Sequence, residues 1–140
     1  MNAQAEKYIL LVEDDPVQVK FFGQIIKKIA DEFGLKSKSI TSGEEFLNFI
    51  QEKEGALDIT KNQVKLIILD LQLAADDISG FYILKKLQAK NNIPVLVQSA
   101  DSNHTSIIQA LKLGAEDYFI KGKDRKEGER MFDRIRELVS

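Results

Sequence analysis

Short apolar runs alternate with longer amphipathic segments along the chain. Five consecutive apolar residues at 8–12 are typical of a strand that is buried on both faces. Apolar residues then recur at helical spacing between Phe22 and Phe33. Pro16 suits the first turn of this helix, and Gly34 suits its end. The first part of the chain therefore predicts a strand followed by a helix.

The same alternation continues to the last residues. Further strands are predicted at 37–40, 64–69, 94–99 and 118–120. Helices are predicted at 42–50, 81–87 and 103–113, with a last helix that ends near Val139, and 51–63 is predicted to be a loop. Five strands that alternate with five helices imply an α/β fold with a doubly wound parallel sheet covered by helices on both faces.

Composition excludes several classes of protein. With 44% hydrophobic and 30% charged residues, the chain is neither a disordered nor a membrane protein by composition. The absence of cysteine excludes disulfides, thiolate zinc sites and a thiol nucleophile. His104 is the one histidine, so a multi-histidine metal site is excluded, and we expect it at the surface. A net charge of −2 argues against a nucleic-acid partner.

Chain length predicts the domain organisation. A chain of 140 residues corresponds to about one domain, and we expect a single domain over 1–140 with its core at about 6–139 and no output domain. Residues 1–7 lack the features of a signal peptide, and no apolar run approaches the roughly 18 residues of a membrane span. The expected location is the cytoplasm, with no membrane partner.

Polar residues follow four of the predicted strands. They are the three acids at 13–15, Asp70, the segment from Ser99 to Asp101, and Lys121. In doubly wound sheets, ligands bind outside the carboxyl ends of the strands at a topological switch point. If the first and third strands are neighbours, the carboxylates of Glu13, Asp14 and Asp70 converge there, and they repel one another unless a cation lies among them. Ligation by oxygen alone favours Mg²⁺ or Mn²⁺.

An aspartate beside such an ion, with a lysine and a hydroxyl nearby, has the groups needed for phosphoryl transfer to a carboxylate. Four blocks of the sequence, in order, resemble the receiver domain of bacterial two-component response regulators. They are 9–16 (ILLVEDDP), 66–71 (LIILDL), 95–100 (VLVQSA) and 114–121 (GAEDYFIK). The resemblance covers essentially the whole chain and implies a flavodoxin-like (βα)5 fold with strand order 2-1-3-4-5. It also implies a regulator rather than an enzyme, either a stand-alone protein or a receiver domain of a longer one.

The resemblance assigns roles to the acidic residues. Asp70 would accept a phosphoryl group from a histidine kinase, a histidine phosphotransfer protein or a small phospho-donor. Glu13 and Asp14 would hold Mg²⁺ together with Asp70, and Gln72 would offer its backbone carbonyl to the ion. The phosphorylated domain would then change its preference for a downstream protein target by a shift in population between two arrangements.

The resemblance also assigns roles at the other strand ends. Ser99 would be the switch hydroxyl, and Lys121 would pair with the phosphate. Tyr118 matches an aromatic position whose side chain turns inward when the hydroxyl is drawn to the phosphate. Gln72 and Asp101 match positions that tune the rate of dephosphorylation.

Two departures from the family pattern concern loops. The family usually has Pro four residues after the acceptor, where this chain has Ala74, and Gly about eight residues after it, where this chain has Gly80 ten residues after Asp70. The loop therefore contains about two extra residues, and it carries extra acids at 76–77. The second departure is Gly122, which follows the lysine where proline is common; this removes the usual source of a cis peptide bond.

Other functions remain open on the sequence alone. An aspartate-nucleophile phosphatase of the haloacid dehalogenase kind needs a second acid at the position of Gln72, and an amide cannot transfer a proton. A flavodoxin-like cofactor binder would need a phosphate-binding loop after the first strand, where this chain has three acids. A pseudo-receiver would bind partners without phosphorylation; the intact Asp70 and Lys121 argue against it, and the longer loop keeps it open.

Simpler interpretations exist for several residues. Asp15 could be only a helix cap, and Tyr118 could be core packing. Ser99 could be a satisfied strand-end hydroxyl, and Lys121 a surface lysine. The acids at 76–77 fit a solvated loop, and the charges at 121–130 fit a solvated helix face. If the last helix left an apolar face exposed, that face could support a homodimer.

Overall fold

Five parallel strands form the central sheet. They are β1 (Tyr8–Val12), β2 (Lys36–Ile40), β3 (Val64–Asp70), β4 (Val95–Ser99) and β5 (Asp117–Ile120), in the spatial order β2-β1-β3-β4-β5. The computed structural model describes residues 6–72, 79–90 and 93–140, without the side chains of 89 and 90. The doubly wound fold and the strand order predicted from the sequence are confirmed.

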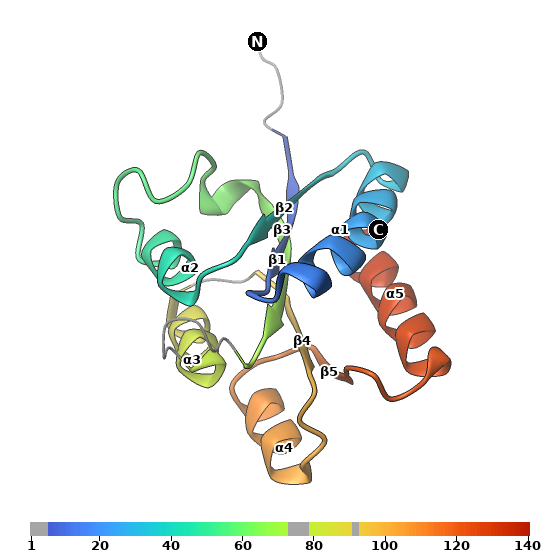
Figure 1. The fold of residues 1–140 in the computed structure, drawn as a ribbon. Coiled ribbons are helices and arrows are strands. Elements are labelled where there is room, and N and C mark those ends of the chain that lie inside the picture. Colours follow the sequence, from blue (N-terminus) through green and yellow to red (C-terminus); the bar gives the residue numbers. More distant parts are fainter. Residues whose placement is uncertain (1–5, 73–78, 91–92) are drawn as a thin grey trace.

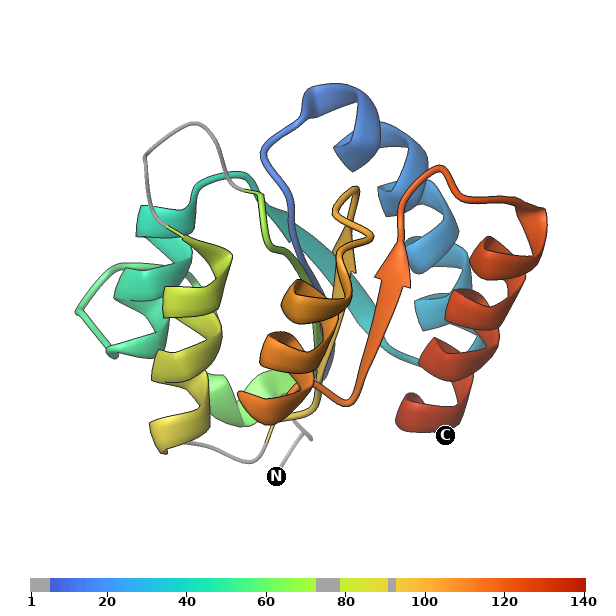
Figure 2. The same ribbon diagram turned by 90° about the horizontal axis from the view of Figure 1, so that it is seen from below.

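Five α-helices cover the sheet on both faces. They are α1 (Pro16–Glu32), α2 (Gly43–Ile50), α3 (Gly80–Lys90), α4 (His104–Lys112) and α5 (Arg125–Val139). α1 and α5 pack on one face, and α2, α3 and α4 pack on the other (Figure 1 and Figure 2). Within the described ranges, no helix is long and apolar enough to cross a bilayer.

The alternation of side chains along each strand divides the core between these two faces. On β3, Leu66 and Ile68 pack toward α1 and α5, whereas Ile67 and Leu69 pack toward α2, α3 and α4. Both sets are buried, which explains why the strand is a continuous apolar run in the sequence. Because successive side chains point to opposite faces, Asp70 lies on the same face as Ile68. The polar end of β3 therefore faces the α1 and α5 layer.

Short polar side chains cap the helices where the sequence predicts that they begin. The Asp15 carboxylate accepts a hydrogen bond of 2.9 Å from Val17 N, and Ser42 Oγ accepts one of 3.2 Å from Glu45 N. These bonds satisfy backbone N–H groups that have no partner within their own helix. Asp15 is thus a helix cap, as one of the simpler interpretations holds.

The segment 51–63 differs from the predicted loop in one place. A short 3-10 helix, η1 (Lys61–Gln63), leads directly into β3. Its start is held by a hydrogen bond of 3.0 Å from Thr60 N to the Gln63 side chain. The spacing of Thr60 and Gln63 is that of a capping box, which is the signal that could have predicted this turn.

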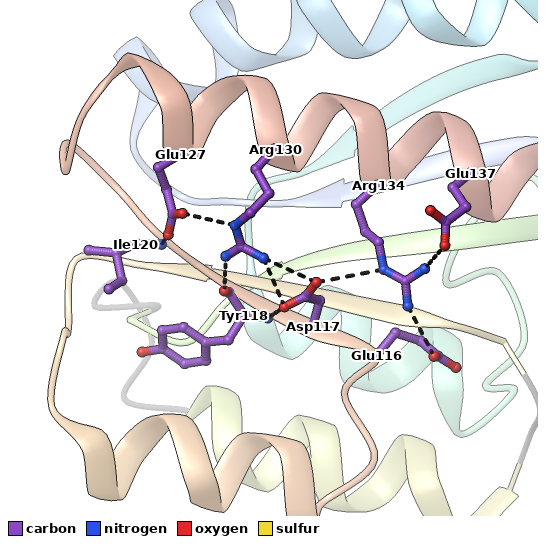
Figure 3. A network of polar contacts seen from close by, with 8 residues as sticks. All are labelled: Glu116, Asp117, Tyr118, Ile120, Glu127, Arg130, Arg134 and Glu137. Carbon is purple, nitrogen blue, oxygen red and sulfur yellow. Dashed lines mark hydrogen bonds and ion pairs between the residues drawn. The ribbon is translucent and has the colours of Figure 1, made fainter.

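Most charged side chains at 121–130 are exposed, as the charge pattern predicts, but Glu127 on the first turn of α5 is only 8% exposed. Its carboxylate accepts hydrogen bonds of 2.8 Å from Ile120 N and 3.1 Å from Arg130 Nε. Arg130 also donates to Tyr118 O at 3.0 Å, and its guanidinium lies 4.2 Å from the centre of the Phe119 ring. Figure 3 shows the hydrogen bonds of Glu127 and Arg130 bridging α5 and β5. Charged side chains here dock the helix onto the sheet.

The apolar side chains of α5 mostly point into the core. Met131 and Ile135 are 3% and 0% exposed, so the exposed apolar face that a homodimer would use is not formed by these two residues. Large apolar side chains that are exposed include Val17 and Phe21 on α1 and Ile108 on α4. Homodimer formation stays a prediction.

Candidate functional site

Three carboxylates meet at the carboxyl ends of β1 and β3. Val12 is paired in register with Leu69, so the residues that follow them, Glu13 and Asp70, lie side by side. One carboxylate oxygen from each of Glu13, Asp14 and Asp70 lies within 4.8 Å of the others. Glu13 and Asp70 are 0% and 3% exposed, and Asp14 is half-buried. The convergence predicted from the strand ends is therefore present.

Lys121 brings one positive charge to this acidic cluster. It follows β5, two strands away from β3, and its long side chain reaches back along the ends of the strands. Nζ lies 2.5 Å from Glu13 Oε1 and 3.0 Å from Asp70 Oδ2. Only 16% of the Lys121 side chain is exposed. Two buried carboxylates thus share the ammonium of Lys121. Lys121 is therefore not the surface lysine of the simpler interpretation.

Burial and crowding set the protonation of this cluster. Burial raises the pKa of Glu13 to about 7, and the nearby Asp70 carboxylate adds to the rise while Lys121 opposes it. Burial alone would lower the pKa of Lys121, but its hydrogen bonds to Glu13 and Asp70 raise it above its ordinary value. A single ammonium therefore leaves the three carboxylates with an excess of buried negative charge.

The donor set fits a hard divalent cation. Glu13, Asp14 and Asp70 offer only carboxylate oxygens, which are the ligands preferred by Mg²⁺ and Mn²⁺. Gln72, the other predicted ligand, lies just past β3, and its backbone N–H donates to Asp70 Oδ1 at 2.9 Å. This bond orients the Asp70 carboxylate at the end of its strand.

Ser99 lies at the end of β4 and is fully buried. Its hydroxyl oxygen accepts a hydrogen bond of 3.1 Å from Asp101 N, and its carbonyl accepts one of 2.8 Å from Lys121 N. The structure therefore brings the backbones of Ser99 and Lys121 together. The Ser99 hydroxyl is a local acceptor, and it also interacts with the phenol of Tyr118, whose pKa it lowers against the effect of burial.

Asp101 links the end of β4 to α4. Its carboxylate accepts hydrogen bonds of 2.6 Å from Ser106 Oγ and 2.8 Å from Asn103 N. The Ser106 bond, with that from Asn103, lowers the pKa of Asp101. The Asp101 carbonyl accepts a further bond of 2.7 Å from the Tyr118 hydroxyl. Asp101 is thus held between the start of α4 and the aromatic side chain on β5.

Tyr118 is 4% exposed and packs on the α2, α3 and α4 face of the sheet, opposite to Asp70. Burial raises the pKa of its phenol, so the hydroxyl stays protonated and donates. The hydroxyl reaches the Asp101 carbonyl, which lies two residues past Ser99. The aromatic-switch role assigned to Tyr118 stays a prediction, as does the core-packing interpretation.

Gln98 is a polar residue that the sequence analysis does not single out. It pairs in register with Asp70 on β3 and Phe119 on β5, and it is 1% exposed. Among the described residues, neither the oxygen nor the nitrogen of its side-chain amide has a hydrogen-bond partner. One signal in the sequence could have pointed to Gln98. It is a polar residue inside the apolar run at 95–98, which ends at Ser99.

The departures from the family pattern lie beside the site. Ala74 and the acids at 76–77 fall outside the described residues. At Gly80 a Cβ would lie 2.4 Å from the Leu71 Cα, so only glycine fits there. Gly122 has a φ of +71°, a conformation that favours glycine. His104 begins α4 and is exposed, as expected.

Comparison with known proteins identifies a family. The sequence matches the family described as "Response regulator receiver domain" over residues 9–133. Response regulator protein GraR of Staphylococcus haemolyticus (strain JCSC1435) is 31% identical over 114 residues, which make up 81% of this chain and 44% of that protein. The chain spans less than half the length of the curated relatives that it matches.

Solved structures agree with the fold. The receiver domain of Francisella response regulator 1452 has a TM-score of 0.69 and 26% sequence identity, and the alignment covers 96% of this chain and 97% of that one. The signal receiver domain of a DNA binding response regulator protein (merR) from Colwellia psychrerythraea 34H has a TM-score of 0.72 at 18% identity, with 94% and 99% covered.

Proposed function

The chain belongs to the family of response regulator receiver domains, and on this premise we propose that it is a signalling switch in which Asp70 accepts a phosphoryl group. The observation that carries the proposal is the buried cluster in which Lys121 Nζ contacts both Glu13 and Asp70, at 2.5 and 3.0 Å. Such a cluster places a carboxylate nucleophile beside a fixed positive charge.

In the proposed reaction, an oxygen of the Asp70 carboxylate attacks the phosphorus of a phosphohistidine. The carboxyl O–P bond forms while the donor's P–N bond breaks, and the leaving imidazole nitrogen keeps the electron pair. Lys121 lies close enough to balance negative charge that arrives with the phosphoryl oxygens. The Gln72 N–H, at 2.9 Å from Asp70 Oδ1, keeps the carboxylate in one orientation during the attack.

Glu13, Asp14, Asp70 and the backbone carbonyl of Gln72 would hold the divalent cation, Mg²⁺ or Mn²⁺. When bound, the ion supplies positive charge that offsets the phosphoryl oxygens and the buried carboxylates. The all-oxygen donor set within 4.8 Å supports this assignment.

We further propose how the signal leaves the site. The Ser99 proton would be donated to a phosphoryl oxygen, which would pull on the Ser99–Asp101 segment. Since the Asp101 carbonyl holds the Tyr118 hydroxyl and its carboxylate holds Ser106 of α4, this pull would reach β5 and α4 together. Gln72 and Asp101, next to the acceptor and the hydroxyl, would set the lifetime of the phosphoryl group.

The proposed donor is a histidine kinase or a histidine phosphotransfer protein of a two-component system, and the proposed output is binding to a downstream protein. The domain would assist only its own phosphorylation and dephosphorylation and would not be an enzyme for other substrates. It would work in the cytoplasm, where such donors act.

Intact mass spectrometry after incubation with Mg²⁺ and acetyl phosphate tests the acceptor. We expect one added phosphoryl group in the wild type and in Asp58→Asn, a matched change at a surface carboxylate. We expect none in Asp70→Asn or in the presence of chelator. A folded wild-type protein that binds Mg²⁺ but gains no phosphoryl group would contradict the proposal and favour the pseudo-receiver.

Lys121→Ala tests the coupling between phosphorylation and response. We expect this variant to accept the phosphoryl group but to lose the accompanying NMR shift changes in β5 and α4. The same shift changes in the phosphorylated variant as in the phosphorylated wild type would contradict the role of Lys121.

A further inference from the structure

A cavity of about 370 Å³ lies between α1 and α5, on the side of the sheet that carries Asp70. Its walls are mainly aromatic and apolar, formed by Phe21, Phe22, Ile25, Phe119, Met131 and Phe132. This volume is within the range of pockets that bind small molecules. The cavity is therefore large enough for a ligand of one or two fused rings.

The cavity has one unusual polar group in its lining, the side chain of Gln98. Gln98 is 1% exposed, and within the described part of the chain both atoms of its amide lack a hydrogen-bond partner. Buried amides are normally hydrogen-bonded, because leaving them unpaired costs free energy. An amide offers a donor and an acceptor side by side, and its complement is a group that offers an adjacent acceptor and donor.

The charged residues around the cavity are already engaged within the chain. They are Lys121, Asp124, Arg125, Glu127 and Glu129. Lys121 contacts the site carboxylates, Arg125 pairs with Glu129 at 3.1 Å, and the Asp124 carboxylate accepts a hydrogen bond of 2.8 Å from Glu127 N. The Glu127 carboxylate is held by Ile120 N and Arg130. Lys121 and Glu127 are held by buried contacts, whereas Asp124, Arg125 and Glu129 are exposed, where water and salt screen their charges. The buried part of the cavity therefore favours a neutral ligand.

We propose that this cavity binds a small neutral aromatic molecule whose edge carries an adjacent carbonyl and N–H, as in a lactam or a carboxamide. The rings of the ligand would pack against the phenylalanine walls. Because both amide atoms of Gln98 are covered in the ligand-free protein, the polar edge of the ligand would pair with this amide by displacing the side chains that cover it. Gln98 is the register neighbour of Asp70, and Lys121 lines both the cavity and the acidic cluster. The ligand would therefore lie next to the acceptor without using its groups.

Gly128 provides a way to close the cavity by substitution. It lies on α5 in the lining, and a Cβ at this position would meet only Phe132, with Cε2 at an ordinary contact distance of 4.0 Å. Gly128→Ala should therefore fit without a clash. Gly128→Leu should place its branched side chain in the space that a ligand would occupy.

The test uses two probes of similar size, 2-quinolone as the lactam and naphthalene as the hydrocarbon. Binding is followed by ¹H–¹⁵N NMR of the full chain, without any phospho-donor. We expect 2-quinolone to shift the Gln98 side-chain NH₂ signal and the amides of Gly122 and Gly128 in a saturable way. Naphthalene should bind about tenfold more weakly, the order expected for losing hydrogen bonds in a dry site.

Two kinds of variant distinguish the contribution of the cavity to binding from that of the Gln98 amide. Gln98→Met has a similar volume without the amide, and should reduce 2-quinolone binding to the level of naphthalene. Gly128→Leu should remove the binding of both probes, whereas Gly128→Ala should keep it. Equal 2-quinolone binding in Gln98→Met, or no saturable shift with either probe in the wild type, would overturn the proposal.

The outcome is independent of the phosphorylation switch. Asp70→Asn should bind 2-quinolone as the wild type does, so a failure of the switch chemistry leaves this test intact. If the Gln98 NH₂ signal responds to Mg²⁺ with acetyl phosphate but to neither probe, the amide serves the acceptor site and the ligand proposal is wrong.

Discussion

Glu13 and Glu127 are both buried glutamates, yet their pKa values move in opposite directions. Burial raises the pKa of Glu13 to about 7. Burial would also raise the pKa of Glu127, but the hydrogen bond from Ile120 N and the contact with Arg130 hold it below its ordinary value. Both residues have little exposed surface, at 0% and 8%, but Glu13 lies deeper, so burial raises its pKa more strongly and its partners offset less of the rise.

The charges next to the two carboxylates also differ. Each oxygen of Glu127 has its own donor, Ile120 N for one and Arg130 for the other, within the network of Figure 3. Each oxygen of Glu13 has a donor too, Lys121 Nζ and Asp15 N, but Glu13 shares the ammonium with Asp70, whose negative charge raises the pKa of Glu13 further. Both carboxylate oxygens of Glu127 are therefore satisfied within the chain. In the acidic cluster, three carboxylates surround one ammonium, and such an excess of buried negative charge is typical of a cation-binding site.

Removal of the Lys121 ammonium should cause the largest loss of stability among the predicted changes. Lys121→Met leaves two buried carboxylates without their ammonium, which should lower the free energy of unfolding by about 3 kcal/mol. Urea denaturation at neutral pH in chelator measures the change. Lys20→Met, at an exposed position on α1, is the control and should change stability by less than about 0.5 kcal/mol. Equal effects of the two substitutions would show that the cluster does not depend on this ammonium.

Addition of Mg²⁺ should stabilise the acidic cluster and leave the α5 network unchanged. At 100 times its dissociation constant, an ion that binds only the folded state stabilises it by about 2.7 kcal/mol. We expect a rise in the melting temperature that chelator reverses, a smaller rise in Asp14→Asn, and the full rise in Glu127→Gln. A full gain in Asp14→Asn would argue against Asp14 as a ligand.

Removal of Glu127 should destabilise the fold without affecting metal binding. Glu127→Ala leaves Ile120 N without its acceptor, and loss of a buried hydrogen bond of this kind should cost about 2 kcal/mol in unfolding free energy. Glu129→Ala is the matched control, because the pair of Glu129 with Arg125 is exposed and should contribute about 0.5 kcal/mol or less. Urea denaturation would contradict the proposed role if the two variants were equally stable.

The pH dependence of stability should show the smallest effect. Because the pKa of Glu127 is lower in the folded state than its ordinary value of 4.5, its contribution is complete above about pH 4.5. That contribution is lost as the pH falls through the folded-state pKa. The stability difference between the wild type and Glu127→Gln should therefore shrink as the pH falls from 6 to 3. A difference that stayed constant in urea denaturation over this range would mean that ionisation of Glu127 does not stabilise the fold.

Much of the fold can be predicted from local residue patterns. The strand at 64–69 is a continuous apolar run because both faces of β3 are buried, and Asp15 and Ser42 are caps by residue type and position. β2 gave a weak signal because it lies at the edge of the sheet and, of its five residues, Ile40 alone is buried. Edge strands need not be apolar, so pattern analysis detects them poorly.

The acidic cluster was predictable for a topological reason, since parallel strands deliver their ends to one edge of the sheet. The roles of Glu127 and Gln98 were not predictable in this way. Glu127 stands among seven other charged residues at 121–130, and its burial depends on how α5 docks on β5. Among the described residues the amide of Gln98 has no hydrogen-bond partner, and this depends on which side chains surround it on β3, β4 and β5. Both are consequences of packing between elements, which residue spacing does not encode.

The close approach at Gly80 has a consequence for the history of this chain. Gly80 N donates a hydrogen bond of 3.2 Å to the Leu71 carbonyl, next to the acceptor, and the missing Cβ lets the two backbones touch. The contact between Leu71 and Gly80 therefore fixes the two ends of the segment that connects them. Residues can be gained or lost in that interval during evolution while the ends keep their separation. A change of length such as the two extra residues that the family resemblance implies after Asp70 would leave this contact in place, whereas a substitution at Gly80 would disrupt it.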